Sequence, residues 1–199
     1  MILFRKFPQA RLKLYNTQIM EKWLFTPFTY LAGWKALMIG CIFFIITSVV
    51  GYFSQIHFDG PISLHHGLDI PIHFFLLECI IAWLSLAIVF YLFGLLLSKS
   101  AIRFIDIAGT IALARTPVAL TSLGLLPWFK LLNTSSLLFM PFNFLYMLPL
   151  LWIVILYYNA YRISCNLKGV RLIVSFIAGI CVAEIISKIA VVQLYKLFL

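Results

Sequence analysis

Long apolar stretches dominate this chain and limit the folds that are open to it. Hydrophobic residues make up 64% of its 199 residues and charged residues 11%, whereas soluble domains carry about 25% charged residues. Five stretches are each near the ~20 residues that a helix needs to cross ~30 Å of hydrocarbon. They cover residues 34–53, 71–97, 104–130, 145–163 and 170–194. The sequence therefore predicts an all-α membrane protein, with a bundle of five transmembrane helices in one domain, 34–199.

Residues 1–33 form a basic N-terminal segment before the first predicted span. Leu12, Tyr15, Ile19 and Trp23 have helical spacing and lie among basic residues. This pattern predicts an amphipathic helix in the membrane interface, although an irregular solvated tail fits the same composition. No apolar region followed by a small-residue cleavage site is present, so we do not expect a cleaved signal peptide.

The basic residues fall mainly on one side of the predicted bundle. With the N-terminus inside, only Lys130 and Lys196 lie in outer regions, and eleven of the fifteen basic residues lie in inner ones. These eleven are Arg5, Lys6, Arg11, Lys13, Lys22, Lys35, Lys99, Arg103, Arg162, Lys168 and Arg171. Because Lys and Arg collect in cytoplasmic loops, we expect a cytoplasmic N-terminus and an external C-terminus. Topology and attraction to anionic lipids at the cytoplasmic face then explain the net charge of +9, and no nucleic-acid partner is needed.

Charged side chains also lie inside the predicted spans, where a charge at the bilayer centre costs at least ~2.5–3.5 kcal/mol. Counted at about 1.5 Å per residue, Glu78, Arg115 and Glu184 each lie about 18 to 20 Å from the inner boundary. We therefore expect Arg115 to pair with Glu78, with Glu184 or with both. Lys188 lies one turn after Glu184 and can share its carboxylate. Such an intramembrane charge cluster suits either a packing clamp or a polar site for a substrate, a proton or a lipid head group.

Two further features belong to the third predicted span. Pro117 lacks a backbone donor and lies two residues after Arg115, so it predicts a helix kink beside the charge. Asp106 lies one turn inside the inner boundary, where a carboxylate favours a helix N-terminus. We expect Asp106 to pair with Arg103 or with basic residues of the loop 162–171.

Histidines are concentrated around the outer loop 54–70. His57, His65 and His66 lie in this loop and His73 follows it. Histidine is a common zinc ligand, but the spacing matches no defined metal motif, so we expect a polar loop with only weak metal candidates. No Walker loop, nucleotide fingerprint, GxSxG or HExxH motif occurs. We therefore expect neither a cofactor nor enzymatic activity.

Several short motifs occur in a characteristic order. They are WLFTPFTY at 23–30, IDIAGTIALARTP at 105–117, LLWIVILYYNAYRI at 150–163 and NLKGVRLIVSFIAG at 166–179. In this order they resemble the Yip family, the Ypt/Rab-interacting-protein type of membrane domain, in its compact bacterial-like form. The resemblance implies five transmembrane helices without an established catalytic activity. Eukaryotic members are linked to Rab-type GTPases, vesicle traffic and membrane shaping, but this sequence lacks their long cytosolic N-terminal region, which leaves GTPase binding without support.

These observations favour a non-enzymatic multi-pass protein that organises membranes or binds membrane-protein partners, including further copies of itself. The compact form suggests a bacterial inner membrane, with an endomembrane as the alternative. The second interpretation is a small transporter or lipid-handling protein that uses Arg115, Glu78 and Glu184. A spacious polar cavity reaching Arg115 would favour transport, and a tightly packed bundle would favour a scaffold.

Overall fold

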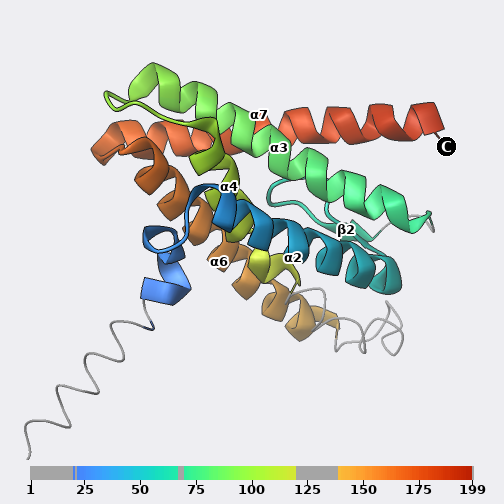
Figure 1. The fold of residues 1–199 in the computed structure, drawn as a ribbon. Helices are drawn as coiled ribbons and strands as arrows, with labels where there is room; N and C mark the ends of the chain where they lie inside the picture. Colours follow the sequence, from blue (N-terminus) through green and yellow to red (C-terminus); the bar gives the residue numbers. More distant parts are fainter. Residues whose placement is uncertain (1–19, 21, 67–69, 120–138, 199) are drawn as a thin grey trace, which may run out of the picture.

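The computed structural model describes residues 20, 22–66, 70–119 and 139–198. Over these ranges the chain is almost entirely helical, with one short hairpin between the first two long helices (Figure 1). In chain order the elements are η1 (Pro27–Thr29), α2 (Gly33–Ser54), β1 (Ile56–His57), β2 (His65–His66), α3 (Ile72–Leu97), α4 (Phe104–Ala114), α6 (Phe139–Cys165) and α7 (Gly169–Phe198).

Four helices in the described part of the chain are long and apolar enough to cross a membrane. They are α2, α3, residues Leu148–Cys165 of α6, and α7. Their outward faces carry large apolar side chains, and Leu96 and Val170 are 80% and 75% exposed. Exposed apolar surface of this extent is typical of a face covered by lipid. The fold is therefore all-α and consistent with a multi-pass membrane protein.

The third predicted span, 104–130, has a different form. Helix α4 begins at Phe104 but ends at Ala114 after 11 residues, a length of about 16 Å that is too short to cross the hydrocarbon. A further helical turn covers 116–119, and the rest of the predicted span lies outside the described residues. Because the ring of Pro117 clashes with the carbonyl four residues back, the expected kink takes the form of a helix end. A fifth span stays a prediction.

Helix α4 lies at the centre of the bundle and packs against α2, α3 and α6. Every residue from Ile107 to Ala114 is buried. Glycines allow the close approach of α2 and α4, because a Cβ at Gly109 would collide with the carbonyl oxygen of Gly33. Small residues of this kind let membrane helices pack backbone against backbone.

The start of the described chain is attached to α6. Residues 22–25 are helical, and the indole Nε1 of Trp152 donates to the carbonyl of Leu24 at 2.9 Å. The side-chain amide of Asn159 donates to the carbonyl of Phe25 at 3.0 Å. Most of the predicted amphipathic helix lies outside the described residues, so its interfacial position stays a prediction.

Candidate functional site: a loop held by buried charges

The loop between α2 and α3 folds into the bundle, although the sequence predicted a polar loop on its outer side. Ile56, His57 and Phe58 are only 1%, 1% and 4% exposed. Gln55 adopts a left-handed conformation with φ of 56° at the end of α2, which turns the chain back. Strands β1 and β2 then pair antiparallel, with His57 opposite His65, and lie between α2 and α3 (Figure 1). Non-helical backbone at membrane depth is tolerated when protein buries it, and residues 56–58, 60 and 61 of this loop are buried.

Glu78 connects the loop to α3 and α7. Its side chain is fully buried, and its Oε1 lies 2.8 Å from Nδ1 of His57. The hydroxyl of Tyr195, near the end of α7, donates to the same oxygen. The ring of His57 also stacks on Phe75, with centroids 4.3 Å apart. One carboxylate on α3 therefore fixes the first strand of the loop and the end of α7.

Arg115 lies at the C-terminal end of α4 and is 3% exposed. A cation is favourable there because the last carbonyls of a helix carry partial negative charge. Its Nη1 donates to the hydroxyl of Tyr157 on α6 at 3.3 Å, and that hydroxyl donates to the carbonyl of Pro61 at 3.2 Å. The Cys79 thiol also lies beside the guanidinium. Arg115 therefore reaches the loop through Tyr157.

Glu184 holds the loop from the side of α7. Its Oε2 accepts from the backbone N–H of Ile62 at 3.3 Å, and its Oε1 lies 3.9 Å from Nζ of Lys188. One turn later on α7, the hydroxyl of Ser187 donates to the carbonyl of Asp59. A Cβ at Gly60 would collide with the Glu184 carboxylate. Glycine at this position lets the loop backbone approach α7.

The intramembrane charges thus meet the same loop rather than one another. In the described residues, no ion pair joins Arg115 to Glu78 or Glu184, although the expected pair of Glu184 with Lys188 is present at 3.9 Å. In place of the expected direct pairing, Arg115 donates to Tyr157, and Glu78 and Glu184 bond to His57 and to the backbone of Ile62. Tyr157, Tyr195 and Ser187 were missed from the sequence, since buried hydroxyls on apolar helices carry no motif.

The predicted pair at the inner boundary is present. Nε of Arg103 lies 2.8 Å from Oδ2 of Asp106, and Nη2 lies 3.1 Å from Oδ1. Hydrogen bonding to Asp106, together with its negative charge, raises the pKa of Arg103. Of the two partners proposed for Asp106, Arg103 is therefore the one observed.

The histidines do not converge on a metal site in the described chain. His57 is bound to Glu78, and Nδ1 of His65 lies 3.5 Å from Oδ1 of Asp59. His73 is exposed and its ring packs on Phe74, while the side chain of His66 lies outside the described residues. No group of three or more His, Cys, Asp or Glu side chains that could hold a metal ion occurs in the ranges that the structure describes.

Two buried carboxylate oxygens remain without a hydrogen bond in the described part of the molecule. They are Oε2 of Glu78 and Oε1 of Glu184, although the latter has the long contact with Lys188. Buried polar atoms usually find a partner, so each exception calls for a physical reason. Chemically, the site can clamp a loop and can offer these two oxygens to a proton or a cation.

Comparisons with known proteins give no relative for this chain: no family model, no curated protein and no solved structure matches it. A function must therefore be inferred from the chain's own residues.

Proposed function

We propose that this chain is a non-enzymatic multi-pass membrane protein of the Yip type, which organises membranes or binds partners within them. The observation that carries the proposal is the use of the intramembrane charges. Glu78 and Glu184 hydrogen-bond directly to the loop 54–70, and Arg115 reaches it through Tyr157. Charged groups placed in this way hold a bundle together and are not arranged around an open reaction site. This supports the packing clamp over the working site.

The Yip assignment is supported by the order of motifs in the sequence. The stretch 105–117 contains the small residues, the arginine and the proline of the resemblance, and it supplies α4, the central helix of the bundle. The basic inner regions support a cytoplasmic N-terminus and attraction to anionic lipids, and the compact form of the resemblance supports a bacterial inner membrane.

A test uses the purified chain in vesicles that contain a pH-sensitive dye. The scaffold proposal expects the same proton leak with and without protein under an imposed pH gradient. It also expects vesicle shape, seen by electron cryo-microscopy, to change with protein density. Arg115→Leu should lower the thermal stability and leave the proton leak at the level of protein-free vesicles.

The second candidate is a small transporter that uses the same buried cluster. The two unbonded carboxylate oxygens favour it, because intramembrane ionisable groups commonly mark proton or ion pathways. The break in the third span after α4 adds to this, since transporters place their sites at interrupted helices. A proton flux that Glu78→Gln or Glu184→Gln abolishes, in protein that remains folded, would replace the scaffold proposal with this one.

A further inference from the structure

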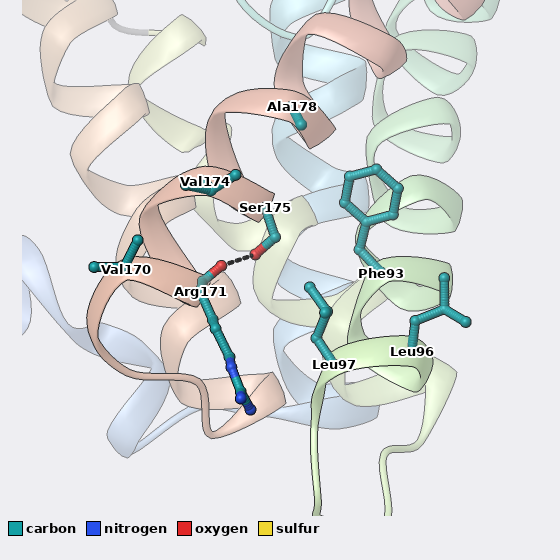
Figure 2. Close-up of a pocket in the computed structure, with 8 residues that line it drawn as sticks. All are labelled: Phe93, Leu96, Leu97, Val170, Arg171, Val174, Ser175 and Ala178. Carbon is teal, nitrogen blue, oxygen red and sulfur yellow. Dashed lines mark hydrogen bonds between the residues drawn. The ribbon is translucent and has the colours of Figure 1, made fainter.

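An apolar groove opens between α3 and α7 at the end of the bundle that is remote from the loop 54–70. Its volume is about 500 Å³. Figure 2 shows its two walls, one from the end of α3 and one from the start of α7. The walls consist mainly of Phe93, Leu96, Leu97, Val170, Val174 and Ala178. The one hydroxyl in the lining, that of Ser175, donates to the carbonyl of Arg171 at 2.7 Å. It is therefore engaged in a hydrogen bond within α7 and does not donate into the groove.

The depth of this groove matches one leaflet of a bilayer. It extends along α7 from Val170, next to the helix start at Gly169, to Ala178. Nine residues of helix span about 14 Å, which is close to half of the ~30 Å hydrocarbon core. An apolar groove of this depth on an exposed helical face has the dimensions of an acyl chain.

A basic recess adjoins the groove at the end formed by Leu97 and Arg171, on the predicted cytoplasmic side. The recess has a volume of about 300 Å³ and lies between the loops that follow α3 and α6. Leu97 and Arg171 line both hollows, so the two are adjacent. The polar lining consists of Lys99, Ser100, Asn166, Lys168 and Arg171. The side-chain amide of Asn166 donates to the Ser100 hydroxyl at 3.2 Å. This bond connects the loop after α3 to the loop after α6 at the base of the recess.

The three basic side chains of this recess are not neutralised by the protein. Within the described residues, Lys99, Lys168 and Arg171 form no ion pair, whereas Arg103 and Lys188 each lie near a carboxylate. No acidic residue lines the recess or the groove in the part of the chain that is described. Three cations at the membrane boundary, next to an apolar groove, are complementary to a phosphate that carries an acyl chain.

We propose that this combined hollow binds one anionic phospholipid from the leaflet that the sequence predicts to be cytoplasmic. The phosphate lies among Lys99, Lys168 and Arg171, and an acyl chain lies in the groove between α3 and α7. This inference goes beyond the proposed function because it names a ligand and a site. It holds for a scaffold and for a transporter alike, since the hollow is remote from the Glu78 and Arg115 contacts.

The test measures lipid bound to the full chain, purified in detergent and stripped of lipid. Phosphatidylglycerol and phosphatidylcholine with identical acyl chains are titrated separately, and bound lipid is counted by native mass spectrometry. We expect half-saturation with phosphatidylglycerol at a concentration about tenfold lower than with phosphatidylcholine, since each basic residue near the phosphate adds to the attraction. Equal binding of the two lipids would overturn the proposal.

A matched pair of double variants locates the site. Lys168→Gln with Arg171→Gln removes two charges from the recess, and Lys22→Gln with Lys35→Gln removes two exposed charges on the same predicted face. We expect the first pair to weaken phosphatidylglycerol binding about tenfold and the second to change it less than twofold. If both pairs weaken it equally, the attraction belongs to the whole face and the site is refuted.

The groove is tested separately with charges intact. Val174 is 60% exposed on the groove wall, so Val174→Trp should fold normally while its indole fills the space for an acyl chain. We expect weaker binding of long-chain phosphatidylglycerol, about fivefold. Inorganic phosphate should fail to displace the lipid at equal concentration. Unchanged lipid binding by Val174→Trp, or full displacement by phosphate, would leave an anion site and contradict the proposal.

Discussion

The two ends of this bundle use their polar residues in opposite ways. At the end that contains the loop 54–70, Glu78, Glu184 and Tyr157 each contact the loop, and residues 56–58, 60 and 61 of it are buried. At the other end, Lys168 and Arg171 border an open recess and have no ion-pair partner in the described chain. One end is filled by the protein itself, while the other leaves space and charge for something else.

The difference shows how burial decides the role of a charge. A buried charge needs a partner, because removing that partner leaves the other group desolvated and unpaired. A charge at the membrane boundary keeps its water and remains available to a ligand. Substitutions at the closed end should therefore change stability, and substitutions at the open end should change binding.

Glu78→Leu should produce the largest loss of stability at the closed end. Glu78 is fully buried, and its Oε1 is the partner of both His57 and Tyr195. Removing it leaves the buried His57 and the partly buried Tyr195 without that partner, at a cost of about 3–5 kcal/mol in the free energy of unfolding. Denaturant titration of the detergent-solubilised chain, followed by tryptophan fluorescence, measures this change.

Two controls separate this effect from a general response to substitution. The Glu78→Gln variant keeps an amide oxygen that can accept a hydrogen bond from either His57 or Tyr195. Its loss of stability should be less than half of that caused by Glu78→Leu. Lys168→Gln, at the open end, should shift the free energy of unfolding by less than about 0.5 kcal/mol. If Glu78→Leu and Lys168→Gln unfold at the same denaturant concentration, the contrast between the two ends is wrong.

Gly60→Val tests whether the loop must approach α7 closely. A Cβ at Gly60 would collide with the carboxylate of Glu184 and the hydroxyl of Ser63. Both obstacles are ends of side chains that can shift, so we expect an overpacking cost of about 1–3 kcal/mol. Amide hydrogen exchange should rise in residues 55–66 and stay unchanged at the start of α7.

A double-mutant cycle identifies the source of that cost. Glu184→Ala loses the hydrogen bond to Ile62 but makes room beside position 60. Combined with Gly60→Val, it should therefore destabilise the chain by less than the sum of the two single changes. Strict additivity would mean that the loop does not lie against Glu184.

Local features of this molecule could be predicted from the sequence, while the partners of its buried charges could not. The pair Arg103 and Asp106 follows from a separation of three residues on one helix turn. The contact between Glu184 and Lys188, at 3.9 Å, follows from a separation of four residues on one helix face. These predictions work because a helix fixes the relative positions of its own residues, whatever surrounds it.

The loop 54–70 shows why the contacts of the candidate site between separate segments could not be predicted from the sequence. Its histidines and aspartates indicate an exposed polar segment. His57 is nevertheless buried, because its Nδ1 forms a hydrogen bond with the carboxylate of Glu78, 21 residues later on α3. Tyr157 bridges Arg115 to Pro61, although Tyr157 and Pro61 are 96 residues apart in the chain. Contacts of this kind depend on how separate helices pack, and no spacing within one segment encodes them. Pro117 did indicate an interruption, but its form as a helix end depends on the packing around α4.

Gly169→Ala should give a smaller loss than Glu78→Leu and than most of the range expected for Gly60→Val, and it completes the contrast. Gly169 begins α7 beside the basic recess with φ of 64°, and a Cβ there would meet nothing within 4 Å. The cost therefore comes from the left-handed backbone alone, about 1 kcal/mol, whereas the cost at Gly60 comes from collision. Denaturant titration should show this small shift without increased exchange in the loop 54–70. A loss as large as that of Gly60→Val would mean that the open end is packed as tightly as the closed one.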